Sequence, residues 1–214
     1  MVYDLLYPES ERDMRNVSCV VAAVYFSKDE LLEIGVDKDA MELNDAFVEY
    51  NEFEKAFELW ESPLYLSDFY DGYREFLEQE YWTGITEAVF FKDVAWSIRS
   101  NKEVLYEKMK HNDLWSLTEP LDVIDEERRL YDSIRVKIKQ GTIGGRYPFR
   151  FYAIEIEENK CYVITGATIK VHKDMGKAPN TKLELEKLRR VYYELDVHGV
   201  KTKDAFIDYL QEAE

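Results

Sequence analysis

The stretch FRFYAIEIEENKCYVITGATIKV, residues 149–171, decides the fold of the C-terminal half of this chain. Two runs rich in β-branched and aromatic residues, 149–157 and 161–171, are separated by the polar tripeptide Glu158-Asn159-Lys160. Such runs favour extended strands, and a connection of three to five residues is typical of a hairpin. The stretch therefore predicts an antiparallel pair of strands.

A further strand is predicted before this hairpin. In YDSIRVKIKQ, residues 131–140, the residues Ile134, Val136 and Ile138 alternate with polar or basic ones. A period of two places one kind of side chain on each face, so this strand should be half-buried with a basic outer face. The glycine-rich segment 141–145 then lies between two predicted strands, which indicates a turn and not a phosphate-binding loop that enters a helix.

Helices are predicted after the hairpin. The segment PNTKLE, residues 179–184, matches a capping box that begins a helix running through Leu195, and Gly199 ends this helix. A last helix is expected from about Asp204 to Glu212.

The N-terminal part is predicted to be mainly helical. Residues 17–26 form a buried strand or a short core helix, and Ser27 then begins a short helix through a second capping box. From 40 to 60 apolar residues recur at steps of three and four, which predicts one helix of about six turns with acids such as Glu52 on its outer face. Pro63 ends it, and the next helix is expected to pack against it as a hairpin. We expect the aromatic stripe of this pair to form core, with a binding groove as the alternative.

Residues 84–110 predict two more helices, with a break at Ser100-Asn101, because serine and asparagine are favoured at the N-cap. The alternation of helical and extended patterns along the chain predicts a mixed α+β protein.

The composition is that of an ordinary folded chain, with 214 residues, 46% hydrophobic and 34% charged. The first residues are acidic where a signal peptide needs a basic start, and the longest apolar run, residues 17–26, is too short to span a bilayer. We therefore expect a soluble, cytoplasmic protein without a membrane partner. Cys19 and Cys161 match no metal-binding spacing, so we expect two buried thiols, no metal and no cofactor.

Charge is distributed unevenly along the chain, whose formal net charge is −16. Residues 1–85 contain 21 acidic and 6 basic side chains, a net charge of −15. Residues 127–191 contain 15 basic and 8 acidic side chains, a net charge of +7. An acidic surface repels phosphate, whereas a basic centre of this kind attracts it.

The basic side chains gather on the predicted sheet and the helix that follows it. They are, in chain order, Arg135, Lys137, Lys139, Arg150, Lys170, Lys173, Arg189 and Arg190. With Tyr152 and His172 to move protons, such a surface could hold an RNA phosphate and stabilise the charge that develops at phosphorus. The simpler interpretation is that an outer strand face must be polar and that lysine or arginine discourages pairing between sheet edges.

The residues around this basic group resemble a known family. They are the run RFYAIEI (150–156), the strand YVITGATIK (162–170), the segment MGKAP (175–179) and the capped helix from Thr181. Together they resemble the RelE/HigB-like toxins, and especially their phage-derived toxin-like branch. In that family an arginine begins a strand, a later strand ends near a lysine cluster, and a helix begins near a short segment with proline and threonine.

The resemblance covers roughly residues 84–198 and is most specific from 149 to 190. It implies a small antiparallel sheet flanked by helices, with the helices of 84–110 as the family's N-terminal helical hairpin. On this basis the chain divides into an acidic, aromatic-rich, mainly helical region, residues 1–83, and a RelE-like α+β domain, residues 84–214.

Active members of the family cleave mRNA, often on the ribosome, without a metal. The resemblance therefore implies a toxin-antitoxin-type endoribonuclease with RNA or the ribosome as its partner. Arg150 and Lys170 match the family's pattern best, and Lys173 matches it less closely. Tyr152 and His172 are the candidates for proton transfer. The candidates for RNA binding are Arg135, Lys137, Lys139, Lys173 and Arg189.

The chain departs from the family in length and charge, because such toxins are about half as long and basic. One hypothesis is that the acidic region masks the basic sheet in cis, as an acidic antitoxin would in trans. The alternative is a catalytically inactive protein- or RNA-interaction module that docks a protein partner through its acidic helical hairpin, since a fold alone does not determine function. A third hypothesis is an accessory protein whose acidic face mimics nucleic acid.

Overall fold

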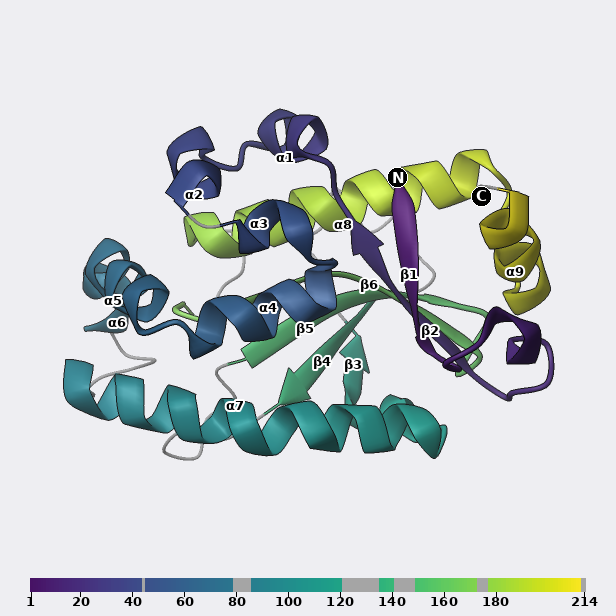
Figure 1. Ribbon diagram of the computed structural model, residues 1–214, viewed down its shortest axis with the longest axis horizontal. Helices are drawn as coiled ribbons and strands as arrows, with labels where there is room; N and C mark the ends of the chain where they lie inside the picture. The colour runs from purple at the N-terminus through teal and green to yellow at the C-terminus, as the bar shows by residue number, and fades with distance from the viewer. Residues whose placement is uncertain (44, 79–85, 121–134, 141–148, 173–176, 213–214) are drawn as a thin grey trace.

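The computed structural model describes residues 1–43, 45–78, 86–120, 135–140, 149–172 and 177–212 (Figure 1). Its strands are β1 (Val2–Tyr7), β2 (Val20–Tyr25), β3 (Thr118–Pro120), β4 (Arg135–Gln140), β5 (Phe149–Ile156) and β6 (Cys161–Ile169). Its α-helices are α1 (Lys28–Ile34), α2 (Lys38–Leu43), α3 (Ala46–Glu49), α4 (Glu52–Glu61), α5 (Pro63–Gly72), α6 (Arg74–Leu77), α7 (Glu87–Lys110), α8 (Pro179–Val197) and α9 (Lys203–Glu212). Two short 3-10 helices, η1 (Glu11–Asp13) and η2 (Leu114–Leu117), complete these elements.

The strands form one sheet in the order β1-β2-β6-β5-β4-β3. The predicted hairpin is present, with β5 and β6 antiparallel from Phe149 opposite Ile169 to Ile156 opposite Cys161. β2 and β6 run parallel, with residues 20–23 opposite 161–164. The N-terminal strands β1 and β2 therefore lie in the same sheet as the hairpin.

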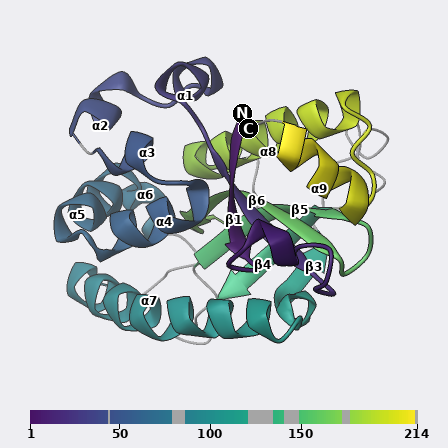
Figure 2. The ribbon, with the colours of Figure 1, turned by 45° about the vertical axis from the view of Figure 1, so that its right-hand side comes forward.

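Helices cover both faces of this sheet, as Figure 2 shows. Because side chains alternate along a strand, Phe149 and Phe151 of β5 pack with α4, α5 and α7, whereas Ile154 and Ile156 pack with α8 and α9. The chain therefore has two apolar layers, one on each side of the sheet.

The predicted α+β class is confirmed, but the sheet differs from the expected small antiparallel one. It is extended by β1 and β2 and contains a parallel pair. The physical reason lies in β2, whose residues Val20 to Val24 are all fully buried. A strand that is apolar on both faces is stable in the interior of a sheet, between two layers of helices. The N-terminal region and the predicted C-terminal domain thus share one sheet, and the boundary at residue 83 stays a prediction.

Two further details agree with the sequence analysis. Ser27 and Glu30 form the predicted capping box of α1, and Gly35 ends this helix with φ 101°, in the left-handed region that favours glycine. Cys19 and Cys161 are buried free thiols, and burial raises the pKa of both.

The single helix predicted from 40 to 60 is wrong, because three helices, α2, α3 and α4, occupy this part of the chain. Asn51 adopts an extended conformation before α4, and its side chain accepts hydrogen bonds from the N–H groups of Phe53 and Glu54, each at 3.0 Å. Asparagine offers the backbone this alternative to a continuous helix. The apolar spacing persists across the break, so the pattern did not reveal it.

The predicted break at Ser100-Asn101 is also wrong, because α7 is continuous from Glu87 to Lys110. Val94, Ile98 and Leu105 are all buried, so one apolar stripe holds the whole helix against the sheet. This packing outweighs the modest preference of serine and asparagine for helix ends. Within the described parts of the chain, no helix is both long enough and apolar enough to cross a membrane.

Candidate functional site

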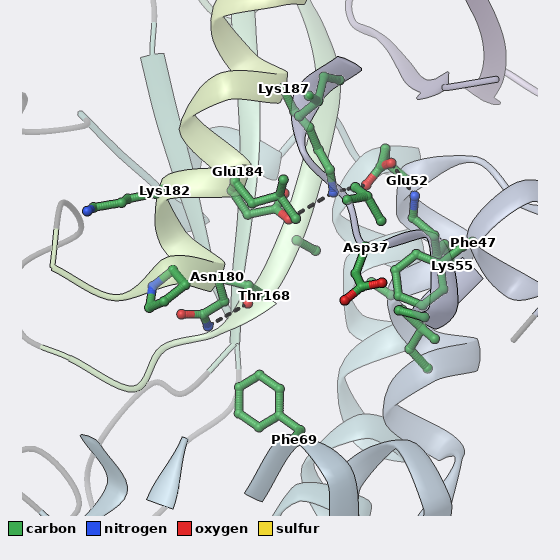
Figure 3. Close-up of a pocket in the computed structure, with 18 of the residues that line it drawn as sticks. Asp37, Phe47, Glu52, Lys55, Phe69, Thr168, Asn180, Lys182, Glu184 and Lys187 are labelled. Atoms are coloured by element: carbon green, nitrogen blue, oxygen red, sulfur yellow. Dashed lines mark hydrogen bonds and ion pairs between the residues drawn. The ribbon is translucent and has the colours of Figure 1, made fainter. Parts of the chain in front are cut away.

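A cavity of about 680 Å³ opens between α4, α5 and α8, next to the second half of β6 (Figure 3). Pockets for small molecules usually have volumes of roughly 300–1,000 Å³ and combine apolar walls with a few placed polar groups. The size of this cavity is therefore suited to a small organic molecule.

The cavity lies at the carboxyl end of the parallel strand pair. β2 and β6 pair only as far as Ala23 and Ile164, and a bulge then makes Thr165 an extra residue in β6. Residues 34–37, after β2, and residues 179–187, after β6, both contribute to the cavity wall. In α/β sheets, ligands bind in crevices at the carboxyl ends of parallel strands, and bulges often occur beside such sites.

Four charged side chains lie buried together in the wall of the cavity. Lys187 donates hydrogen bonds to Oε1 of Glu184 at 2.8 Å and to Oε2 of Glu52 at 3.0 Å. Lys55 donates to Oε1 of Glu52. All four side chains are at most 5% exposed, and dashed lines in Figure 3 mark their ion pairs. We call Glu52, Lys55, Glu184 and Lys187 the buried ionic cluster.

Burial and pairing act in opposite directions on the pKa values of this cluster. Burial raises the pKa of Glu184 to about 7, against the lowering effect of Lys187 and with a further rise from Glu52. Burial also acts on Glu52, but Lys187 and Lys55 hold the pKa of its carboxyl below the ordinary value. Burial lowers the pKa of Lys55. Glu184 can therefore gain or release a proton near neutral pH.

The second carboxylate oxygen of Glu184 lies against β6. A Cβ atom on Gly166 would be 1.7 Å from Oε2 of Glu184, so a glycine is needed at this position to accommodate the carboxylate. This oxygen has no hydrogen-bond partner among the residues that the structure describes. Because an unpaired buried acceptor is costly, this oxygen is an unsatisfied polar group in the cavity wall.

Asn180 carries a second unpaired acceptor, one helical turn before Glu184. Its Nδ2 donates to Oγ1 of Thr168 at 2.9 Å and to the backbone oxygen of Ile169 at 2.8 Å. A backbone carbonyl can only accept, so this bond fixes the orientation of the amide. Oδ1 of Asn180 is left without a donor in the described part of the chain.

Aromatic rings form another part of the wall. Phe69 of α5 and Tyr73, which follows it, have ring centroids 4.6 Å apart, and Tyr65 lies one turn earlier. Trp60 of α4 lies against Phe149, with centroids 4.5 Å apart. Burial raises the pKa of Tyr65 and Tyr73, so their hydroxyl groups stay protonated at neutral pH.

α8 begins differently from the prediction. Pro179 occupies the first turn, and Ala178 precedes the helix without a side-chain cap. The predicted capping box of residues 179–184 is therefore wrong, because Glu184 pairs with Lys187 in the cavity and does not turn back to the helix end.

Two residues predicted to be catalytic lie in the interior, outside the cavity. Tyr152 is 1% exposed and packs in the apolar layer under α8. Arg150 is 6% exposed, and its Nη1 donates to the backbone oxygen of Phe149 at 2.9 Å. The strand face that carries both was expected to be open, but α8 covers it.

The other predicted catalytic residues follow the end of β6. Lys170 and His172 are half-buried, and the His172 ring lies edge-on to Phe76, with centroids 5.9 Å apart. Arg150 is opposite Thr168 in the sheet, so the structure brings Arg150 and Lys170 to neighbouring positions.

The predicted RNA-binding residues are spread over two elements. In the backbone of β4, Arg135, Lys137 and Lys139 lie opposite Ile154, Tyr152 and Arg150 of β5. Arg189 lies far along α8 and pairs with Glu186 of the same helix. Lys173 lies outside the described residues. The roles of all these residues stay predictions.

Carboxylates of the acidic region, residues 1–83, pair with basic side chains on helices of the remaining chain. Glu33 pairs with Arg190 at 2.7 Å, and Glu54 pairs with Lys102 at 2.6 Å. Glu52 adds the pair with Lys187. Carboxylates of the first region thus neutralise cations of α7 and α8, and masking of the sheet itself stays a hypothesis.

Metal binding and family relationships give no further indication of function. In the part of the chain that the structure covers, no three histidine, cysteine, aspartate or glutamate side chains are grouped to hold a metal ion. Comparisons with protein-family models, with curated proteins and with solved structures found no match. Function must therefore be inferred from the chemistry of the cavity.

Proposed function

We propose that this protein binds a small organic molecule in the cavity between α4, α5 and α8. The observation that carries the proposal is the buried ionic cluster in the cavity wall. Apolar residues of similar size would usually stabilise a fold as well as a buried ion-pair network does, or better. Ionisable groups with shifted pKa values in a cleft are typical of functional sites. Ligand binding accounts for charges that the core itself does not require.

The remaining lining supports this proposal. Aromatic rings supply apolar contact area, while Asn180 and Glu184 present unpaired acceptors that would fix the orientation of a ligand. Lys187 ties the two sides of the cavity together, because it bonds to residues of both α4 and α8. A wall held in this way is preorganised, which reduces the free-energy cost of binding.

A library of small molecules tests the proposal through thermal unfolding. Ala40 is half-buried in the cavity lining, so Ala40→Trp should fill the cavity without altering the core. Ala205→Trp is the matched control, because Ala205 is half-buried in α9, away from the cavity. A ligand at 100 times its Kd stabilises the folded state by about 2.7 kcal/mol.

The proposal predicts library members that raise the Tm of the wild type and of Ala205→Trp, but not that of Ala40→Trp. A ligand that stabilises all three proteins equally would place the binding elsewhere. A library without any stabilising member would contradict the proposal.

RNA cleavage on the sheet is a second candidate, supported by the register of β4 and β5. Lys137 lies opposite Tyr152, and Lys139 lies opposite Arg150. Basic residues thus flank the two strand positions to which the family resemblance assigns catalysis. The burial of Tyr152 weighs against this candidate, because proton transfer requires contact with the RNA.

Growth and translation after induced expression in bacteria test this second candidate. Wild type and the control Lys38→Ala/Lys201→Ala, which removes two exposed lysines, should arrest growth. Arg150→Ala/Lys170→Ala should not, provided that it remains folded. No arrest by the wild type would count against cleavage and favour an interaction module that docks through its acidic helices.

A further inference from the structure

We infer that the cavity takes a neutral, hydroxyl-rich ring molecule of the saccharide class. The inference rests on the proposed function and adds the chemistry of the ligand. It follows from three properties of the cavity wall, namely its open hydrogen-bonding atoms, its charge balance and its aromatic surface.

The open acceptors require donors on the ligand. Oδ1 of Asn180 and Oε2 of Glu184 have no donor among the described residues. The two side chains lie four positions apart on α8, about 6 Å along the helix axis, and therefore on the same face. A ring with several hydroxyl groups can offer a donor to each of two acceptors on one helix face.

The wall also offers donors. Lys55 has Glu52 as its one hydrogen-bond acceptor among the residues that the structure describes, although an ammonium group carries three N–H donors. The hydroxyl groups of Tyr65 and Tyr73 are further donors in the lining. A hydroxyl group both donates and accepts, so a polyhydroxylated ligand can satisfy both kinds of group at once.

The charge balance of the cluster favours a neutral ligand. At a pH above 7, where Glu184 is ionised, its two carboxylates and two ammonium groups compensate one another through the three ion pairs. An additional cation would be repelled by Lys55 and Lys187, and an additional anion would be repelled by Glu52 and Glu184. Either would leave an uncompensated charge in a buried site, which is costly.

Aromatic rings supply an apolar surface in the cavity wall, in addition to its polar groups. Phe69 and Tyr73 contribute neighbouring rings to the wall, and Figure 3 shows Phe69 across the cavity from Glu184. A sugar ring has a face of C–H groups and a rim of hydroxyl groups, so it can pack on the aromatic rings while its rim reaches α8.

A matched series of sugars tests the inference on the wild-type protein. The probes are the methyl glycosides of glucose, galactose and mannose, each compared with its amino sugar and its uronic acid. Each set keeps the ring and replaces one substituent, a hydroxyl by an ammonium group or a hydroxymethyl by a carboxylate. We expect at least one neutral glycoside to bind about tenfold or more tightly than both of its charged counterparts, measured by NMR titration.

Two variants locate the contact. Asn180→Leu keeps the size of the side chain but removes the acceptor together with the bonds donated to Thr168 and Ile169, so it should weaken binding of that glycoside about tenfold or more. Asp196→Leu, exposed on the same helix and outside the cavity lining, should change the affinity little. The comparison of the three charge states needs no variant, so it is decisive even if Asn180→Leu does not fold.

The outcomes separate the inference from the proposed function. Equal or tighter binding of a charged sugar would overturn the neutral class. Binding of library molecules without binding of any sugar would overturn the inference and leave the proposed function standing. No binding of either kind would overturn both.

Discussion

The ammonium group of Lys187 lies 3.0 Å from Oε2 of Glu52, which is 135 residues earlier in the chain. The same group bonds to Glu184 at 2.8 Å. Lys187 thus links its own helix, α8, to α4 beside β6. Stability and ligand binding should therefore depend on the same few residues.

Lys187→Met should destabilise the protein by about 3–5 kcal/mol, because it leaves Glu52 and Glu184 buried without their shared cation. Denaturation in urea measures the loss. Arg190→Met is the control, since its pair with Glu33 is on the surface of the same helix and should contribute less than about 1 kcal/mol. Equal losses in the two variants would show that the buried cluster has no special role in stability.

Gly166→Ala should cost about 1–3 kcal/mol, because its Cβ would lie 1.7 Å from Oε2 of Glu184 and force the carboxylate to move. Gly72→Ala, at the end of α5, is the control, because nothing lies within 4 Å of the added Cβ. That variant should change the free energy of unfolding by less than about 1 kcal/mol. In a Glu184→Ala background the cost of Gly166→Ala should fall, and an unchanged cost would disprove the contact.

The pKa of Glu184, raised from 4.5 to about 7 in the folded protein, gives a definite pH dependence. Folding favours the protonated form of Glu184. The contribution of this group to the free energy of unfolding is therefore complete below pH 4.5 and is lost as the pH rises through 7. The slope in this window reaches up to about 1.4 kcal/mol per pH unit. Glu52, whose pKa is lowered, acts in the opposite sense at lower pH.

Glu184→Gln should remove this decline between pH 4.5 and 7, as measured by urea denaturation across the window. Glu186→Gln should keep it, because Glu186 is half exposed and lies outside the cluster. Identical profiles for wild type and Glu184→Gln would mean that Glu184 does not titrate there.

Asn51→Ala should destabilise the protein by about 1 kcal/mol, because the side chain caps α4 with two hydrogen bonds in a buried position. Thr86→Ala, which removes a longer capping bond of 3.4 Å at an exposed position before α7, should cost less. Thermal unfolding of both variants checks the order, and the reverse order would contradict the importance of the Asn51 cap.

The strands β4, β5 and β6 could be predicted because their signal is local, namely alternation and a short polar turn. The apolar run before Ser27 left β2 open between a strand and a short core helix, and β1 and β3 were not predicted. The breaks between α2, α3 and α4 could not be predicted, because successive helices that share one apolar face keep the spacing of a single long helix. The parallel pairing of β2 with β6 joins segments about 140 residues apart, and no local pattern specifies it.

The candidate site was missed for a similar reason. Glu52 with Lys55, and Glu184 with Lys187, are spaced three apart and look like ordinary surface pairs on helices. They become buried only because α4 and α8 meet beside β6. One signal was present in the sequence, namely Gly166 inside a predicted strand, since an interior glycine often marks a close approach.

Chemical-shift mapping by NMR, with a small molecule that stabilises the protein, tests most directly whether the cavity is the binding site. If the cavity is the binding site, the methyl signals of Leu59, Ala167 and Leu183 and the indole N–H of Trp60 will shift on titration. The methyl signals of Val24 and Ile207, in the layer under α8 and α9, will not. Shifts confined to residues outside the cavity, or none at all, would show that the cavity does not bind the molecule.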